Sequence, residues 1–571
     1  MKRVLLLVLF VGSFDFQPAN AQVAFADVSA EAGIADVGLM NHGIAVADYD
    51  NDGWEDLYVA RRDGPNRLYR NNGDGTYTDL AATLGLDFAG DTPVALWGDV
   101  DNDGWLDLYL GNYSVPDRLY LSKAGGTQFL DVSATAGMLD ASKVKSAMFG
   151  DLDNDGWLDL YVARASTQNT YYHNDGNGAF TDRIVESGAT DSQLAMGALL
   201  FDYDNDGDLD IYLTHDSYQS NILYQNDGNG QFSDVSVATG VNYSGLGMGV
   251  DFGDFNRDGW LDLYITNLSY NTLYLNNADG TFSNIVVEAG VGDTGMGWST
   301  AFLDCDNDGW QDIYMVNGPP TPNILYQNLG DNTFSIASAG SPLESYGNAF
   351  GMACTDLDND GRMDLFVANS NDAVGNQLFR NENTDGFHWL KVRTRGVTSN
   401  RAGIGARVEV EIGGELLVDE VAAGTGYASQ NSLIQHFGLG DATTVDRLTV
   451  RWPSGQVDVY ENLEADRQYL VVEGESLATA AEEPVRDALQ LQVWPNPVQT
   501  ELSVRFSLEK GGPVYLEMRD ALGRPIARQS RIFATAGEYQ LEVPTADLPA
   551  GTYALTLRRE NAVQTHWIVR K

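Results

Sequence analysis

The chain has 571 residues, and its 81 Asp and Glu against 34 Lys and Arg give a formal net charge of −47 at pH 7. This excess of acid excludes a basic surface that could neutralise a nucleic-acid backbone. The 43% of hydrophobic residues excludes a disordered acidic tail, and two cysteines exclude a disulfide scaffold, a thiolate zinc site and a C-x-x-C redox motif. Many short apolar segments among 61 glycines favour turn-rich β structure.

Residues 1–21 have the pattern of a secretory signal peptide. Two basic residues precede an apolar run over residues 4–11, and Ala19-Asn20-Ala21 forms a small-x-small cleavage pattern. A membrane anchor is the alternative, but about eight apolar residues are too few to cross a bilayer. We therefore expect cleavage after Ala21 and no transmembrane segment in the mature protein, which would be soluble once exported.

The string D-x-D-x-D-G-x-x-D recurs seven times, once with Asn as its second acidic position, at a period of about 51 residues, and its first Asp stands at 48, 99, 151, 202, 254, 304 and 356. Each repeat contains four short apolar segments, the last preceded by a glycine-rich turn such as Asn72-Gly73-Asp74-Gly75. Four strands in a unit of this length are typical of a propeller blade. The sequence predicts an all-β fold with a seven-bladed β-propeller over residues 25–386.

The two ends of the repeat region predict how the ring closes. Phe25-Ala26-Asp27-Val28 matches the fourth-strand segments of later repeats, although no repeat precedes it. The seventh repeat ends after its third segment, Asn376–Phe379, where a different pattern begins. We expect residues 25–28 to complete blade seven, which would remove an exposed sheet edge.

The acidic loops have the spacing of calcium ligands. Oxygen ligands at alternate positions, followed by Gly and a fourth carboxylate, let a tight loop wrap a hard cation, and here the loop leads into a strand and not into an EF-hand helix. Of 28 side-chain positions, 27 are Asp and one is Asn256. Without a cation, several carboxylates would repel one another in every loop. Ordinary turn formation, the alternative, predicts scattered aspartates and no fixed spacing.

We therefore predict about seven structural Ca²⁺ ions, each held by four side chains and one backbone carbonyl. The predicted ligands, with the carbonyl donor fourth in each set, are Asp48, Asp50, Asp52, Trp54 and Asp56; Asp99, Asp101, Asp103, Trp105 and Asp107; Asp151, Asp153, Asp155, Trp157 and Asp159; Asp202, Asp204, Asp206, Asp208 and Asp210; Asp254, Asn256, Asp258, Trp260 and Asp262; Asp304, Asp306, Asp308, Trp310 and Asp312; and Asp356, Asp358, Asp360, Arg362 and Asp364.

These repeats resemble the FG-GAP and VCBS family, whose loops are similar to the calcium loops of integrin α-subunit propellers. The resemblance covers about residues 25–386 and implies a calcium-binding propeller. Asn256 departs from the pattern but still offers an oxygen. Asp208 and Arg362 replace the usual Trp at the carbonyl position, where the side chain is not a ligand.

Residues 387–474 carry the segments His388–Val392, Ser399–Ala406, Gly424–Asn431, His436–Gly440 and Trp452–Gly455. They resemble an ASPIC/UnbV domain, the module that follows such propellers in cartilage acidic protein-like proteins. The resemblance implies no agreed biochemical activity. Alternating strands such as Arg407–Ile412 predict a small β-domain, and residues 475–489 lack periodicity and are typical of a linker.

Residues 490–571 contain Trp494-Pro495-Asn496-Pro497, Asp520–Arg524 and Leu548–Tyr553. They are similar to the type A sorting domain of the type IX secretion system, and alternating strands such as Glu501–Phe506 suit a small β-sandwich. The resemblance implies handling by the type IX machinery of a Gram-negative bacterium, removal of this domain, and release or surface attachment. An ordinary adhesive sandwich is the alternative.

We find no catalytic constellation in the sequence. G-x-S-x-G, H-E-x-x-H and a phosphate-binding loop are absent, the six histidines are scattered, and the regular loops account for the paired carboxylates. Cys305 and Cys354 stand at apolar positions of their repeats, which favours buried free thiols over a disulfide between adjacent blades.

Repeat proteins most often carry function where the repeats differ, and the residues six positions before each first Asp differ from repeat to repeat. We expect them to surround one mouth of the propeller channel. They are His42, Pro93, Lys145, Met196, Met248, Trp298 and Phe350. We single out His42, Lys145, Trp298 and Phe350 as candidate contacts for a glycan or surface protein, with core packing as the alternative.

The sequence thus favours a secreted or cell-surface calcium-binding propeller in adhesion or macromolecular binding. A polysaccharide-processing or other hydrolytic enzyme with a site at the channel mouth is one alternative. A purely structural envelope protein is the other.

Overall fold

The computed structural model describes residues 23–477 apart from 124, 371–372 and 385, and in the C-terminal part residues 492–494, 498, 501–508, 512–520, 525–533, 537–546, 548–549, 551–559 and 562–571. The chain forms two compact units, residues 1–476 and 477–571. The predicted signal peptide and most of the predicted linker lie outside the described residues. Within the described residues, every helix is too short or too polar to cross a membrane.

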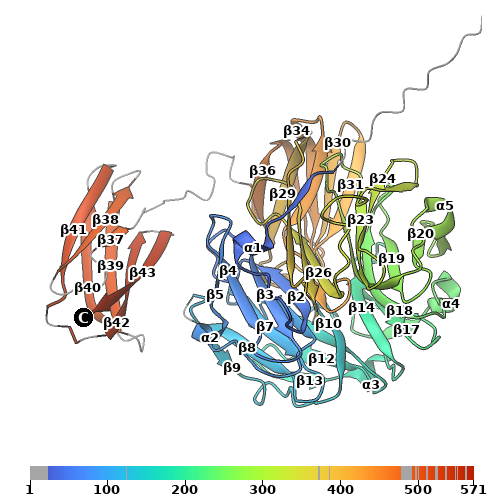
Figure 1. Cartoon of the computed structure of the whole chain (residues 1–571), viewed down its shortest axis with the longest axis horizontal. Coiled ribbons are helices and arrows are strands. Elements are labelled where there is room, and N and C mark those ends of the chain that lie inside the picture. The colour runs from blue at the N-terminus through green and yellow to red at the C-terminus, as the bar shows by residue number, and fades with distance from the viewer. Residues whose placement is uncertain are drawn as a thin grey trace, which may run out of the picture. The chain divides into compact units, whose positions relative to one another are not determined.

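The repeats form seven antiparallel sheets, each with four strands of its own (Figure 1). Blade one consists of β2 (Asn41–Ala47), β3 (Asp56–Arg61), β4 (Arg67–Asn71) and β5 (Tyr77–Asp79). The next blades are β6 (Val94–Gly98), β7 (Asp107–Gly111), β8 (Arg118–Lys123) and β9 (Gln128–Asp131); β10 (Val144–Gly150), β11 (Asp159–Arg164), β12 (Thr170–Asn174) and β13 (Phe180–Asp182); β14 (Ala195–Phe201), β15 (Asp210–His215), β16 (Ile222–Asn226) and β17 (Phe232–Asp234); β18 (Gly247–Gly253), β19 (Asp262–Asn267), β20 (Thr272–Asn276) and β21 (Phe282–Asn284); and β22 (Met296–Leu303), β23 (Asp312–Gly318), β24 (Ile324–Asn328) and β25 (Phe334–Ile336).

Blade seven closes the ring. Its strands are β26 (Ala349–Thr355), β27 (Asp364–Asn369), β28 (Gln377–Asn381) and β1 (Phe25–Asp27), and β1 pairs with β28 in antiparallel register, Phe25 opposite Asn381. Each innermost strand packs against the innermost strand of the next blade, and β26 returns to β2. The prediction that residues 25–28 complete blade seven is confirmed.

Close approach of the innermost strands explains a glycine in several of them. A Cβ built on Gly43 would lie 2.3 Å from the carbonyl oxygen of Pro93 in blade two and 2.5 Å from that of Ala428. Real Cβ atoms do not approach backbone oxygens so closely, so a side chain here would push adjacent blades apart.

Five one-turn helices, which the sequence patterns did not predict, follow the fourth strands at the rim of the propeller (Figure 1). They are α1 (Ser29–Ala32), α2 (Ala81–Leu84), α3 (Ile184–Ser187), α4 (Ser236–Thr239) and α5 (Val286–Ala289). Each ends at a glycine in the left-handed region, such as Gly33 with φ of 80°. Four residues are too few for a helical period to show in the sequence.

We call residues 388–472, which pack on the propeller, the cap. Its strands are β29 (His388–Arg395), β30 (Arg407–Ile412), β31 (Glu415–Glu420), β32 (Ser429–Gln430), β33 (Gln435–Gly440), β34 (Thr444–Arg451), β35 (Val457–Glu464) and β36 (Arg467–Val472). They form the sheets β33-β29-β36 and β31-β30-β34-β35, while β32 leaves the cap and extends the sheet of blade one.

The described residues of the C-terminal unit form two sheets. One is β37 (Gln492–Trp494), β38 (Glu501–Leu508) and β41 (Gly537–Pro544), and the other is β40 (Pro525–Phe533), β39 (Gly512–Asp520), β42 (Gly551–Arg559) and β43 (Ala562–Arg570). Leu502 and Val504 of the first share one buried cluster with Leu555 and Leu557 of the second. This is the β-sandwich that the alternating strands predicted.

Candidate metal centres and channel mouth

The first acidic loop is wound by its own aspartates. Asp48 accepts the backbone N–H of Asp52 on Oδ1 at 2.9 Å and that of Gly53 on Oδ2 at 3.2 Å, and Asp52 accepts the N–H of Trp54 at 3.0 Å. Asn51, at the tip, has φ of 52°. In blades two, three, four, five and seven, the first Asp likewise accepts the backbone N–H groups of the fifth and sixth loop residues.

In blades one, two, three, four and six, a side chain from the third strand contacts the Asp at the third loop position. Oδ2 of Asp50 lies 2.7 Å from Nε of Arg70, and Oδ2 of Asp204 accepts from Nε2 of Gln225 at 2.6 Å. The other oxygen is buried and has no hydrogen-bond partner among the described residues. These unpartnered Oδ1 atoms belong to Asp50, Asp101, Asp153, Asp204 and Asp358.

The ninth-position Asp fixes the loop to the blade. Oδ1 of Asp56 accepts the N–H of Asn71 at 2.7 Å, and the equivalent bond occurs in all seven blades. In blade one, ligand-type oxygens of Asp48, Asp50 and Asp56 lie within 4.8 Å of one another. Comparable groups occur in blades two, four and six, and blade three brings His173 next to Asp153 and Asp155.

The loops concentrate negative charge in a buried place. Burial raises the pKa of Asp48 to about 6, and burial together with the charge of Asp159 raises that of Asp151 to about 8. Burial also raises the pKa of Asp56 well above its usual range. A bound dication would restore the charged form of these groups, because an opposite charge favours ionisation. The donor set is therefore suited to a hard cation.

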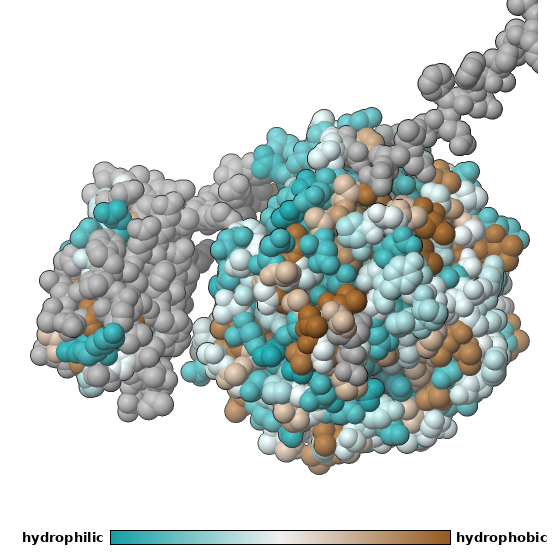
Figure 2. Space-filling view, in the orientation of Figure 1, coloured by the Kyte–Doolittle hydropathy of each residue, from teal (hydrophilic) through white to brown (hydrophobic). Residues whose placement is uncertain are grey.

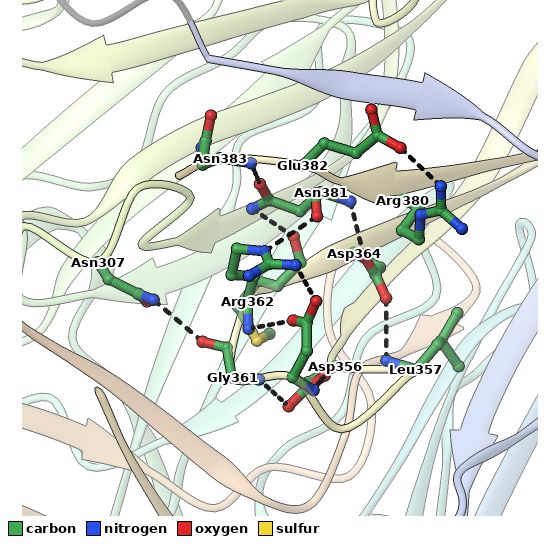
Figure 3. A network of polar contacts seen from close by, with 12 residues as sticks. Asn307, Asp356, Leu357, Gly361, Arg362, Asp364, Arg380, Asn381, Glu382 and Asn383 are labelled. Atoms are coloured by element: carbon green, nitrogen blue, oxygen red, sulfur yellow. Dashed lines mark hydrogen bonds and ion pairs between the residues drawn. The ribbon is translucent and has the colours of Figure 1, made fainter. Parts of the chain in front are cut away.

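Blade seven shows how one loop is connected to its blade (Figure 3). Asp356 accepts the N–H of Gly361 at 2.9 Å, and Asp364 accepts the N–H groups of Leu357 at 3.0 Å and Asn381 at 2.7 Å. Arg362, at the position that other loops give to Trp, donates to the carbonyl of Asn381 and pairs with the carboxylate of Asp360.

The seven loops are joined in a closed ring of hydrogen bonds. The residue at the fourth loop position has positive φ and reaches the loop of the next blade; Asn307, for example, donates to the carbonyl of Gly361 at 3.0 Å. The last bond, from Asn359 to the carbonyl of Gly53 at 3.0 Å, closes the ring. The other donors are Asn51, Asn102, Asn154, Asn205 and Arg257.

The cap covers this ring of loops. Nζ of Lys391 contacts Asp356 and Asn359 of blade seven, and Arg393 contacts Asp48 and Asn51 of blade one. Further bonds come from the N–H of Arg401 to Asn102, from the guanidinium of Arg407 to Asn205 and the carbonyl of Gly259, and from the N–H of Gly440 to the carbonyl of Asn307. The cap thus touches the same tip residues that join the loops.

A segment of the cap, residues 422–431, enters the channel; we call it the plug. Gly426 and Val250 of blade five exchange two backbone bonds, and Phe149 of blade three donates to the carbonyl of Ala423. The amide of Gln430 bonds to both the N–H and the carbonyl of Trp97 in blade two. Other plug residues bond to blades one, six and seven, so six blades hold the plug.

Tyr427 of the plug reaches the end of the channel opposite the loops. Its ring centroid lies 5.1 Å from that of Trp298 and 5.6 Å from that of His42. His42 stacks on Phe350 at 4.8 Å, and Phe350 lies 4.6 Å from Trp298. We call this end the mouth. The strands that begin here run to the loops, so the cap and the mouth lie on opposite faces.

The predicted mouth residues differ in exposure. Pro93, Met196, Met248 and His42 are buried, whereas Lys145, Trp298 and Phe350 are half-buried. The structure brings three of the four candidate ligand residues into one aromatic group, and Lys145 stands beside it on β10. Cys305 and Cys354 are both buried free thiols.

Comparison with known families agrees with this architecture. A family model described as an FG-GAP-like repeat matches residues 48–110, 99–162, 151–213, 202–265, 256–315 and 304–367, more than half of the chain. The chain belongs to the FG-GAP-like repeat family. A model described as ASPIC and UnbV matches residues 396–478, which include most of the cap, and a secretion system C-terminal sorting domain matches residues 492–571.

Mouse and human cartilage acidic protein 1 are each 30% identical to this chain over 223 residues, or 37% of it. The match spans only about a third of those proteins, 34% and 33% of their length. Among solved structures, a lectin of Agrocybe aegerita that recognises non-reducing terminal N-acetylglucosamine is similar over 54% of this chain and 87% of its own, with 18% identity and a TM-score of 0.37.

The sorting domain makes this FG-GAP repeat protein a secreted or cell-surface protein exported by the type IX secretion system. None of the three matched families is a typical enzyme domain.

Sequence reasoning missed three features of the FG-GAP site. The first is the set of third-strand side chains that contact the loops, such as His173 and Arg70. Each of these two is the next-to-last residue of its strand, as in Leu68-Tyr69-Arg70-Asn71. A comparison of the polar residues at this position of the repeat could have found them. The cap contacts had one signal, a group of cations at 391, 393, 401 and 407 in an acidic chain. The plug had none.

Proposed function

We propose that this protein is a secreted or surface-displayed propeller whose seven loops bind structural Ca²⁺. The observation that carries the proposal is the third-position carboxylate, whose Oδ1 is buried without a hydrogen-bond partner among the described residues in five loops. In four of these loops a side chain of the third strand contacts the other oxygen, as Arg70 does in blade one and Gln225 in blade four. A buried unpaired carboxylate oxygen is costly to leave unsatisfied, and a bound cation would satisfy it.

The donor chemistry favours calcium over other metals. The loops offer carboxylate, amide and backbone oxygens, which hard cations prefer. The cysteine in the loop of blade six, Cys305, donates its S–H to Asp312, and burial raises its pKa well above the usual range. A loop with many oxygens can supply the six to eight ligands that Ca²⁺ takes in variable geometry, whereas Mg²⁺ demands a nearly ideal octahedron. We expect affinities of roughly 10⁻⁴ to 10⁻³ M, the range of extracellular modules. Seven ions would bring the formal charge of −47 to −33.

Calcium counting tests the proposal. Equilibrium dialysis of the protein against calcium, followed by elemental analysis, should find about seven ions per chain. Asp204→Asn, which removes a third-position carboxylate in blade four, should lower the count by about one. Glu186→Gln, an exposed acid on α3, is the matched control and should change nothing. Equal binding by both variants, or no bound calcium at all, would overturn the proposal.

We propose further that the protein acts in adhesion or macromolecular binding through the mouth. The cap covers the loop face, so the mouth is the end of the channel that remains to meet a partner. The half-buried Trp298 and Phe350 there can supply the apolar contact area that binding sites use. On the face drawn in Figure 2, apolar residues gather in several small groups among polar ones. Retention of a ligand by immobilised protein, and its loss on Trp298→Ala, would support this role.

A further inference from the structure

A group of cations stands beside the aromatic mouth. The guanidinium carbon of Arg62 lies 4.5 Å from the ring centroid of Tyr113, and the ammonium groups of Lys143 and Lys145 lie 5.0 and 5.5 Å from it. Arg62 is held by a bidentate pair with Asp91, at 2.6 and 3.1 Å. Three cations around one half-buried ring form a local positive centre.

Two of these cations are exceptional for the propeller. Residues 23–386 contain 13 lysines and arginines, and ten of them have a carboxylate within 4 Å in the structure. Lys143, Lys145 and Arg257 have none among the residues that the structure describes, and Arg257 donates to backbone carbonyls under the cap. In a chain with such an excess of acid, two lysines without a carboxylate at one mouth indicate a place for an anionic ligand.

The cations and the aromatic group lie at the same end of the channel, because Lys145 stands near the start of β10 as His42 does near the start of β2. Burial, together with the charges of Arg62 and Lys145, lowers the pKa of His42 to about 3. Burial and Arg62 likewise lower the pKa of Lys145 to about 8. His42 is therefore neutral, and its Nδ1–H donates to the carbonyl of Pro93, because a carbonyl only accepts. This bond fixes the ring on which Phe350 stacks.

The acidic groups near Lys145 limit how much negative charge a ligand can bring to the mouth. Asp91 is occupied by Arg62, and Asp216 is the nearby acid whose charge partly opposes this positive field. The propeller as a whole repels an extended polyanion, since its net charge is strongly negative. The mouth therefore suits a ligand with one or a few anionic groups next to an apolar face.

We propose that the mouth binds an anionic saccharide, its sugar ring against Trp298 and Phe350 and its carboxylate or sulfate group against Lys143 and Lys145. This inference rests on the proposed binding role of the mouth and specifies its ligand class. A sugar ring offers a face of C–H groups that packs on an aromatic side chain, and a charged substituent at its edge would reach the lysines. A neutral saccharide would gain only the first contact.

Binding measurements with matched oligosaccharides test the inference on the full mature chain in calcium. The probes are one glucose oligomer, the same oligomer ending in glucuronate, and the same oligomer ending in a sulfated glucose. We expect the two charged probes to bind about tenfold more tightly than the neutral one, and the carboxylate and sulfate arms identify which anion is preferred.

Variants separate charge from stacking. Lys143→Gln with Lys145→Gln should reduce the affinity for charged probes to that for the neutral probe, and Trp298→Ala should weaken all three. Arg447→Gln with Arg467→Gln, which removes two exposed cap cations, is the control for net charge and should have no effect. If the double mouth variant fails to fold, the exposed Lys143→Gln alone should still weaken charged probes several-fold.

Three results would overturn the inference: equal affinity for charged and neutral probes, no binding of any saccharide, or binding of a polypeptide only. Calcium content measured on the same samples separates this failure from that of the proposed function. A calcium-loaded protein that ignores the anionic group contradicts the inference alone, whereas a protein without calcium contradicts the proposed function.

Discussion

Nζ of Lys391 in the cap lies 2.6 Å from Oδ2 of Asp356, the first carboxylate of the loop in blade seven, with side chains only 5% and 2% exposed. Breaking a buried pair leaves an uncompensated charge. We expect Lys391→Met to lower the free energy of unfolding by about 3 kcal/mol in urea denaturation at calcium too low to fill the loop of blade seven, where no dication compensates Asp356. Arg467→Met, which breaks the exposed pair with Glu464, should cost at most about 1 kcal/mol. Equal losses would mean that the pair does not hold the cap on the propeller.

The bond from Asn307 to the carbonyl of Gly361 is one of the seven that close the loop ring. Gly adopts a φ of 61° without strain, so Asn307→Gly removes only the hydrogen bond. This variant should lower the free energy of unfolding by about 1 kcal/mol. Asn307→Ala removes the bond and strains the backbone as well, so it should cost more. Urea denaturation of both variants measures the difference. If Ala and Gly proved equally harmless, the ring would have no part in stability.

Blade five should hold calcium most weakly. Asn256 replaces the third-position carboxylate, and its amide donates to Asp258 within the same loop at 2.8 Å. Asn256→Asp adds a ligand charge and removes that competing bond, so it should tighten the weakest site about tenfold or more. Calorimetric titration with calcium gives the comparison, and Asn284→Asp on β21 controls for the added charge. A tightening seen in both variants would point to net charge instead of ligation.

The stability of the cap at acidic pH should depend on Glu473. Its carboxylate accepts the N–H groups of Val397, Thr398 and Ser399 at 2.6, 2.6 and 2.9 Å, and bonds with the hydroxyl of Ser454. Burial raises the pKa of this carboxyl, but the hydrogen bonds outweigh burial and hold the pKa below its ordinary value of 4.5. A lowered pKa stabilises the fold above 4.5, and this contribution disappears as the pH falls through the folded value.

Glu473→Gln should therefore be less stable than the wild type at pH 7, and the gap should narrow below pH 4.5. Chemical denaturation at several pH values measures the gap directly. A gap that stays constant down to pH 3 would show that the charge on Glu473 is not what these bonds require.

The repeats could be predicted because each acidic loop lies next to its own strands in the sequence. Spacing alone gave the seven blades, and the match of Phe25–Val28 to later fourth strands gave the closure. The cap could not be placed in this way, because contacts such as Arg393 with Asp48 join residues more than 300 positions apart and leave no local period. The plug could not be foreseen either, since the amide of Gln430 bonds to the backbone of Trp97 and so depends on no side chain there.

The thermal melt of the mature protein in calcium and in excess chelator is the most direct test of the central claim that the seven loops hold Ca²⁺ and thereby the fold. At calcium tenfold above the dissociation constant, each site should contribute about 1.4 kcal/mol. Seven such sites predict a large fall in melting temperature in chelator, restored when calcium returns and not when magnesium is added. An unchanged melt would contradict the account, because it would mean that the carboxylates of these loops need no cation.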